Sequence, residues 1–319
     1  MFEPMRAVGV IEYGGPEALQ VVDVPEEHAG EGQIRLRVYA AAVNPTDTLA
    51  RNGSRAEQQK ADPPPYVPGM DAAGVVDEIG PGVVTDLQVG DRAMAIVLPK
   101  GAHGAYRESL VVPAASVARA PAGSSHAEAA TLPMNGLTAR LSLDLLALAP
   151  GQVVAVTGSA GAYGGYVVQL AKADGLTVIA DASEADRQLV ESLGADLVVP
   201  RGDNVAAEIR RHVPSGVDGL ADGSVQNHLL VAAVRDGGSF TSVRGWTGPE
   251  GGVRGISFTA TFVRDYAREQ TKLDRLGRQA EAGALTLRVA EVYPAERAAD
   301  AHRRLEAGGT RGRCIIAFN

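Results

Sequence analysis

The chain has 319 residues, a net charge of −8 and a pI near 5.3, so it is long enough for two cores and lacks the basic excess of nucleic-acid surfaces. Its single cysteine, Cys314, excludes an intramolecular disulfide and a multi-cysteine zinc site, and it favours a reducing, cytoplasmic location. Because the sequence shows neither the blocks of a signal peptide nor an apolar stretch long enough to cross a bilayer, we expect no membrane partner.

Residues 1–124 contain short alternating runs that are broken by glycine and proline. The runs at 34–38 and 74–79 are typical of strands with one buried face, so we predict an antiparallel, β-rich domain. Residues 51–65 carry Asn-Gly-Ser, a polar run and three prolines, which predicts a loop. Two interpretations of this loop stand: a mobile segment over an active site, or an ordinary surface insertion.

A glycine-rich turn follows the apolar run at 153–157 and leads into a stretch with apolar residues at helical spacing. Where a strand stops and a helix begins, a turn without side chains lets the backbone approach a pyrophosphate, and the N–H groups of the helix point at the anion. The Gly-x-x-Gly-x-x-Gly spacing alone is weak support in a chain with 38 glycines. The candidate cofactor-binding residues of this turn are Gly158, Ser159, Ala160, Gly161, Ala162, Tyr163 and Gly164.

Strand and helix patterns alternate after the turn, and this alternation predicts a doubly wound parallel sheet, a Rossmann dinucleotide-binding domain over 125–264. The alternative is a glycine turn in an α/β domain that binds no nucleotide. The expected strands are 177–181, 196–199, 217–220 and 239–243, and the expected helices are 186–193, 205–213 and 225–234.

The last segment, residues 265–319, is predicted to return to the first domain. Its patterns favour helices over 266–282 and 295–307 and strands over 286–292 and 313–318.

Several motifs together resemble the zinc-free members of the medium-chain dehydrogenase/reductase superfamily, in the quinone oxidoreductase (zeta-crystallin-like) branch. The resemblance implies a GroES-like β-rich catalytic domain, a Rossmann domain, and a cleft between them for nicotinamide and substrate. The motifs are Val43-Asn44-Pro45-Thr46-Asp47, residues 68–76, 89–92, 104–106 and 132–139, the turn at 158–164, and residues 301–308 and 310–313.

The zinc branches of this superfamily hold their catalytic metal with a Cys and a Gly-His-Glu unit. The matching stretches here carry Asn44 and Gly69-Met70-Asp71, which offer no tetrahedral set of nitrogen and sulfur donors. The six histidines are scattered without ligand spacing. We therefore predict no metal.

Without a metal to polarise a carbonyl, the chemistry best suited to such a cleft is hydride transfer from a nicotinamide to an electron-poor acceptor, a quinone or an enone. By resemblance Asn44 and Asp47 border the cleft and Thr138 lies beside the nicotinamide, and these are the predicted catalytic residues. Asn44 is either an amide donor to the carbonyl oxygen or a turn residue before Pro45. Asp47 and Asp71 are expected to accept backbone N–H groups rather than to donate protons.

Two alternatives remain open. Enoyl-thioester reductases of the superfamily carry a tyrosine shortly after the Asn-Pro-x-Asp unit, where this chain has Gly53-Ser54-Arg55, and Tyr66 is expected to pack in the core. This difference favours a quinone over an enone or enoyl thioester. The alternative from another class is a nucleotide-binding redox sensor with little turnover.

The cofactor is NADP(H) or NAD(H), and the sequence supports both equally. Asp181, near the end of the second strand, suits the ribose 2′-hydroxyl of NAD, whereas Ser183 and Arg187 suit the 2′-phosphate of NADP. Arg244 either contacts cofactor or substrate or is a solvated loop cation. Tyr163 either narrows the approach to the pyrophosphate or packs under the turn.

The resemblance also implies a homodimer that forms through an edge strand of the Rossmann sheet near 256–263.

Overall fold

The computed structural model describes residues 4–318, which form two compact units. The first unit runs to Met134 and continues over Ala267–Glu281 and from Leu287 onward. The second unit comprises Asn135–Tyr266 and Ala282–Thr286. Helix α3 (His126–Ala130), expected in the Rossmann domain, belongs to the first unit because it packs against strands of that unit's sheet. Within residues 4–318 no helix is long and apolar enough to cross a membrane.

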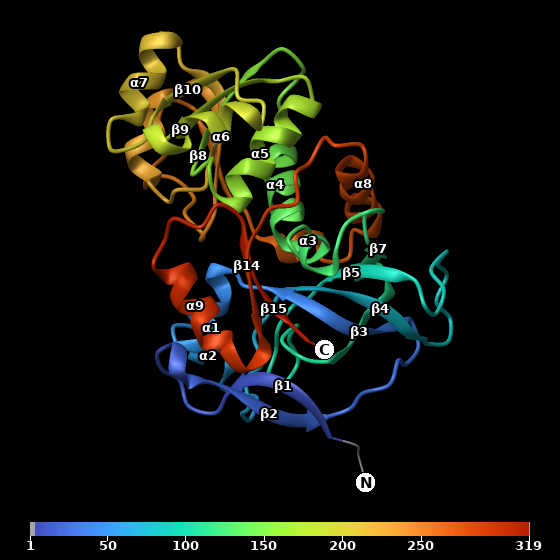
Figure 1. Cartoon of the computed structure of the whole chain (residues 1–319). Coiled ribbons are helices and arrows are strands. Elements are labelled where there is room, and N and C mark those ends of the chain that lie inside the picture. The colour runs from blue at the N-terminus through green and yellow to red at the C-terminus, as the bar shows by residue number, and fades with distance from the viewer. Residues whose placement is uncertain (1–3, 319) are drawn as a thin grey trace. The chain divides into compact units, whose positions relative to one another are not determined.

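The first unit is built on a seven-stranded sheet (Figure 1). Six of its strands have the order β14-β15-β3-β4-β5-β7, and the seventh, β6, pairs with β3 outside this path. The runs predicted at 34–38 and 74–79 lie in β3 and β4, which pair antiparallel. Alternate residues of β3, such as Ile34, Leu36 and Val38, point into the core. The strands are β1 (Pro4–Val10), β2 (Leu19–Pro25), β3 (Gln33–Ala42), β4 (Asp71–Ile79), β5 (Arg92–Ile96), β6 (Ser109–Pro113), β7 (Val117–Arg119), β14 (Val289–Pro294) and β15 (Arg313–Ala317).

The end of the chain returns to this unit, since β15 pairs antiparallel with β3. Helix α9 (Ala298–Glu306) lies beside α1 (Pro45–Arg51) in Figure 1, and the two are in contact. The segment predicted as a loop over 51–65 contains one short helix, α2 (Ala56–Gln59). The helix predicted from residue 266 begins only with α8 (Gln270–Glu281), because Tyr266 ends a separate 3₁₀ turn.

The second unit contains a six-stranded parallel sheet with the order β10-β9-β8-β11-β12-β13. Counted along the chain this is the order 3-2-1-4-5-6 of the Rossmann fold, so the predicted doubly wound sheet is confirmed. The strands are β8 (Val153–Thr157), β9 (Thr177–Ala182), β10 (Leu197–Pro200), β11 (Val217–Asp222), β12 (Val234–Ser242) and β13 (Ser257–Ala260).

The helices of this unit include α4 (Pro133–Leu146), whose first two residues belong to the first unit, α5 (Ala162–Ala173), α6 (Arg187–Ser192) and α7 (Val205–His212). The helix predicted over 225–234 is wrong in type, because a 3₁₀ helix spans Asn227–Ala233. Val225 and Asn227 have positive φ angles, and the N–H of Asn227 donates to Asp222 Oδ2 at 2.7 Å. This bond ties the stretch to the end of β11, and the positive φ angles at Val225 and Asn227 exclude a right-handed helix that starts at residue 225.

Candidate active site

The glycine turn of the second unit joins β8 to α5 as the sequence predicts. Gly158 has φ +68°, which favours glycine, and Gly161 is the N-cap of α5. A Cβ on Gly164 would lie 2.4 Å from the carbonyl oxygen of Gly158, so the helix can approach the strand only with glycine there. The turn therefore offers an uncrowded backbone next to the first N–H groups of a helix, and it fits a dinucleotide pyrophosphate.

Asp181 lies under this turn at the end of β9. Its Oδ1 accepts the N–H of Ser159 at 3.1 Å, and the residue is only 6% exposed. Burial raises the pKa of this carboxyl, while the bonds from the turn oppose that rise. Asp181, which the sequence suggests for the ribose hydroxyl of NAD, is thus hydrogen-bonded to the backbone of the glycine turn.

The other two candidates for cofactor choice also have protein partners. Ser183 Oγ donates to Asp186 Oδ2 at 2.5 Å, and Arg187 Nη1 donates to the carbonyl of Val198 at 3.0 Å. The sequence reasoning missed Arg201, which is exposed just after β10 and whose backbone N–H donates to the carbonyl of Ala182 at 2.9 Å. The signal was available, because a cation directly after the third strand lies beside the end of the second strand in this topology.

Tyr163 packs against the loop after β11. Its ring lies 2.7 Å from the point that a Cβ on Gly223 would occupy, and its hydroxyl is 2.7 Å from Ser142 Oγ. The two interpretations of Tyr163 with respect to a bound pyrophosphate stay predictions. Thr138 is largely buried on α4, one helical turn before Ser142, and Arg244 is exposed after β12 with φ +67°. The contacts of Thr138 and Arg244 with a cofactor stay predictions.

In the first unit, Asn44 is fully buried at the N-cap of α1. Its Nδ2 donates to Asp71 Oδ2 at 2.6 Å, and its backbone N–H donates to Asp47 Oδ2 at 2.8 Å. The structure thus brings together Asn44 and Asp71, which come from the stretches that resemble the zinc-holding ones, and adds Asp47 to them. We call Asn44, Asp47 and Asp71 the Asn44 cluster.

Both carboxylates of the Asn44 cluster are acceptors. Asp47 also accepts the N–H of Gly69 at 3.1 Å and the hydroxyl of Tyr106 at 3.1 Å, and Asp71 accepts the N–H of Met134 at 2.6 Å. Burial raises the pKa of Asp47 to about 6 and that of Asp71 to about 7, although these hydrogen bonds favour the charged forms. Both groups therefore change charge close to neutral pH.

Two further side chains extend the Asn44 cluster and were assigned no role from the sequence. Tyr106 Oη is 3.1 Å from His302 Nε2, and both residues are completely buried. His302 Nδ1 is 3.3 Å from Nη1 of Arg51. The motifs at 104–106 and 301–308 were noted for their resemblance only.

The residues at the positions that match the zinc ligands do not fit a zinc ion. The amide of Asn44 is bonded to Asp71, and Met70 Sδ accepts the hydroxyl of Thr46 at 3.2 Å. In the described part of the chain no group of three or more His, Cys, Asp and Glu residues could hold a metal ion.

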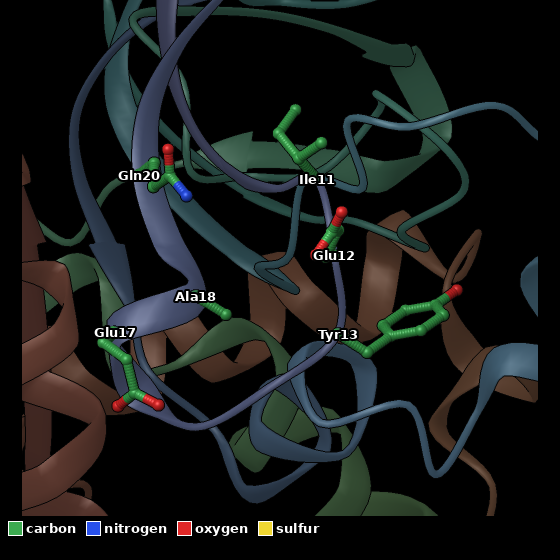
Figure 2. A pocket seen from close by; sticks show the side chains of 6 residues that line it. All are labelled: Ile11, Glu12, Tyr13, Glu17, Ala18 and Gln20. Carbon is green, nitrogen blue, oxygen red and sulfur yellow. The ribbon is translucent and has the colours of Figure 1, made fainter.

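A separate hollow of about 430 Å³ opens between the ends of β1 and β2 (Figure 2). None of the site residues predicted from the sequence lines it. Its lining residues are Ile11, Glu12, Tyr13, Glu17, Ala18 and Gln20.

Comparison with known proteins matches two family models. Residues 30–122 match the alcohol dehydrogenase GroES-like domain, and residues 193–316 match the model described as zinc-binding dehydrogenase.

Among similar proteins, an NADPH-dependent alkenal/one oxidoreductase of Arabidopsis thaliana is 31% identical over 98% of this chain and 79% of its own length. A quinone oxidoreductase of Mus musculus is 30% identical over 98% of this chain and 97% of its own. A crystal structure described as an NAD-dependent alcohol dehydrogenase has a TM-score of 0.87 and 30% identity, and the match covers 99% of this chain and 100% of that one. The chain therefore belongs to the medium-chain dehydrogenase/reductase superfamily, in its quinone oxidoreductase branch, and is an NAD(P)H-dependent oxidoreductase.

Proposed function

We propose that the protein reduces a quinone or a similar activated carbonyl conjugate with NAD(P)H and without a metal. The observation that carries this proposal is the bond between Asn44 and Asp71 at the position where zinc-dependent relatives hold their metal. A site with no Lewis acid suits an acceptor that is already electron-poor. The similarity to a mouse quinone oxidoreductase supports the same acceptor class.

The bound nicotinamide would supply the hydride, and the protein would orient the acceptor. We assign Asn44 the role of donor to the acceptor's carbonyl oxygen, since Asp71 fixes the plane of its amide. Asp47 holds the backbone of Asn44 in place, because its carboxylate accepts the backbone N–H of Asn44. Thr138 is assigned a place beside the nicotinamide. The quinone receives two electrons and one proton as the hydride, and water supplies the one further proton that completes the hydroquinone.

The first test follows the absorbance of NADPH, with NADH in parallel, when purified protein meets a panel of ortho- and para-quinones. We expect saturable oxidation that depends on both protein and quinone, and an Asn44→Ala variant should lose at least about tenfold in kcat because the oxyanion donor is gone. Asn52→Ala, at the other end of α1, is the matched control. Cofactor binding without oxidation by any acceptor would instead support a redox sensor.

A second candidate activity is the reduction of enones. The similarity to an alkenal/one oxidoreductase and to a 2-haloacrylate reductase of Burkholderia favours it. The same assay with an alkenal and an enoyl thioester distinguishes the two activities. A higher kcat/KM for these acceptors than for every quinone would reverse our preference.

For the cofactor we propose NADPH over NADH, with Arg201 as the residue that selects the 2′-phosphate. The carboxylate of Asp181 is buried and bonded to the backbone of the glycine turn, so it is less available to accept a hydrogen bond from the ribose of NADH. Arg201 is exposed at the place where β9 and β10 end side by side, as Pro200 pairs with Ala182. A guanidinium suits a phosphate dianion through paired N–H donors.

Arg201→Ala should raise KM for NADPH about tenfold or more and leave KM for NADH within about twofold. Arg211→Ala, an exposed arginine on α7 paired with Glu208, is the control. If only Arg187→Ala weakens NADPH binding, Arg187 is the residue that binds the 2′-phosphate. If Asp181→Ser binds NADPH more tightly than the parent, Asp181 is the residue that discriminates between NADPH and NADH. Steady-state kinetics with both cofactors measures all four variants.

We further propose a homodimer that forms through β13, the outermost strand of the six-stranded sheet, and a cytoplasmic location. In the described residues β13 pairs with β12 on one side only, so its other edge is open to a second copy. The single cysteine, which is buried, supports a reducing compartment. A monomeric mass by light scattering at micromolar concentration would contradict the dimer.

A further inference from the structure

A row of buried side chains runs through the first unit from the surface to the Asn44 cluster. At its outer end Glu306 of α9 accepts two hydrogen bonds from Arg51 of α1, at 2.6 and 3.3 Å. Arg51 then contacts His302, one helical turn before Glu306, and His302 contacts Tyr106. Tyr106 ends the row at Asp47.

We propose that Arg51, His302 and Tyr106 form a hydrogen-bond chain with one fixed direction, and that this chain positions Asp47 and thereby Asn44. All three are positioning residues, because none of them is assigned a contact with substrate or cofactor. Their effect on turnover rests on the proposed function, whereas the direction of the chain can be tested without it.

The direction follows from which atoms can donate. A guanidinium has donors only, so Nδ1 of His302 must accept from Arg51. Nε2 of the neutral ring then carries the proton and donates to Tyr106 Oη. The hydroxyl of Tyr106 has one hydrogen left, which it donates to the carboxylate of Asp47. Each link has a single allowed direction while Asp47 is charged.

The surroundings of His302 keep the ring neutral. Burial and the neighbouring charge of Arg51 lower the pKa of His302 to about 3. The groups that face the ring are Arg51 from α1 and Tyr106 from the segment before β6, and among residues 4–318 no carboxylate is hydrogen-bonded to it. A second proton on the ring would sit on Nδ1 and point at the guanidinium of Arg51. The ring therefore stays singly protonated at neutral pH, and the direction of the chain does not reverse.

The chain ends on the group that links the two halves of the Asn44 cluster. Asp47 accepts the backbone N–H groups of Asn44 and Gly69 besides the hydroxyl of Tyr106. Asn44 carries the amide of the cluster, and Gly69 precedes Asp71 by two residues. Loss of the bond from Tyr106 would therefore loosen the Asn44 side and the Asp71 side together.

The first test is spectroscopic and needs no turnover. In protein with ¹⁵N-labelled histidine, long-range nitrogen–proton spectra distinguish the tautomers, and His302→Gln identifies the signal of His302 among the six histidines. We expect a neutral ring with its proton on Nε2, unchanged between pH 5 and 8. A proton on Nδ1, or a titration near pH 6.5, would overturn the chain even if the proposed reaction is found.

The second test measures the effect on Asp47. Tyr106→Phe removes one donor to the carboxylate, so its charged form is less favoured and the pKa of Asp47 rises from about 6 past that of Asp71. The acid limb of kcat should then become steeper and move to higher pH, with kcat at least about tenfold lower at pH 7. The other charged groups that act within this cluster are Asp71 of β4 and Arg313 of β15, and both are retained. Tyr293→Phe, a buried tyrosine of β14 outside the chain, is the control.

A merely structural role of Tyr106 would lower thermal stability but leave the pH profile in place, and that outcome would reject the proposal. If Tyr106→Phe does not fold, a pair of variants at His302 replaces it. Glutamine can accept from Arg51 and donate to Tyr106, so His302→Gln should retain most of the activity, whereas His302→Leu should lose it. Equal losses in both folded variants would also reject the chain.

Discussion

Asp71 is the residue whose charge most directly controls the amide of Asn44. Both of its hydrogen-bond partners, Asn44 Nδ2 and the N–H of Met134, are donors. A protonated carboxyl would turn one oxygen into a competing donor. Since burial raises the pKa of Asp71 to about 7, we expect kcat to fall as the pH drops through neutrality.

Asp71→Asn tests this expectation. At pH 8 kcat should fall about tenfold or more, because the new amide presents N–H groups to donors. The acid limb should move toward the pKa of Asp47, about 6, because the group near 7 is gone. A pH–rate profile measures both effects, with the exposed Asp23→Asn as control. An acid limb that stays near pH 7 would reject the role of Asp71.

At this scale the sequence could name only part of the candidate site. Asn44 and Asp47 stand three residues apart in a recognisable motif. Tyr106 is 59 residues from Asp47 and 196 from His302, so no local pattern joins them. Arg201 was missed for another reason: the end of the third strand was predicted to within one residue of Pro200, but only residues at the end of the second strand were considered for cofactor choice.

Among the elements, the junction of β8 and α5 was predictable because its requirements are local: a buried strand, residues free of side chains, and an amphipathic helix. The stretch at 225–234 was not, because its apolar spacing does not reveal the positive φ angles of Val225 and Asn227, which interrupt a right-handed helix there. Where such a backbone conformation and local pattern compete, the pattern alone predicts the wrong helix type.

Gly164 gives a prediction at this scale. In Gly164→Ala the new methyl group would meet backbone atoms of Gly158 and Ser159, at 2.4 to 2.8 Å, which cannot move away without opening the turn. We expect about 1–3 kcal/mol of lost stability and at least tenfold weaker NADPH binding. Calorimetry and fluorescence titration measure the two effects.

The control for Gly164 is Gly277→Ala in α8. There the new methyl would approach the end of the flexible Met94 side chain at 3.3 Å, and alanine favours a helix. This variant should bind NADPH like the parent and be at least as stable. Equal behaviour of the two variants would mean that the close approach at the glycine turn is unimportant.

For the whole molecule, the two-part architecture followed from the change in pattern along the chain. The boundary was harder to predict, because α3 follows residue 124 like a Rossmann element, yet its buried face packs on β3 and β4. A short helix with two buried alanines does not reveal from its sequence which sheet it covers.

The two buried carboxylates also affect the stability of the protein. The pKa values of Asp47 and Asp71 are higher in the folded state than the ordinary value of 3.8, so the folded protein binds these protons more tightly than the unfolded chain. Tighter proton binding therefore stabilises the folded state. This stabilisation is fully present below about pH 4 and is lost as the pH rises through the folded-state pKa values of about 6 and 7.

We therefore expect the free energy of unfolding to decrease between about pH 4 and 7, whereas kcat increases between about pH 5.5 and 8 as Asp47 and Asp71 lose their protons in the folded protein. Urea unfolding at several pH values measures the first trend, and each unit of pKa shift corresponds to about 1.4 kcal/mol. In Asp71→Asn the slope should be smaller. A parent stability that rises between about pH 4 and 7 would contradict the elevated pKa values.

The pairing of β15 with β3 has a consequence for synthesis on the ribosome. The six strands of the second unit lie in one continuous stretch, so its sheet can form as soon as that stretch has emerged. The first unit must wait until β15 is translated, and until then residues 40–42 of β3 lack this partner, because β6 pairs only with residues 33–37. His302, in α9, is also translated after the second unit, so a chain that stops before it would carry a finished nucleotide fold without the histidine link to the Asn44 cluster. Such fragments would bind cofactor without turnover and be exposed to aggregation through the open strand.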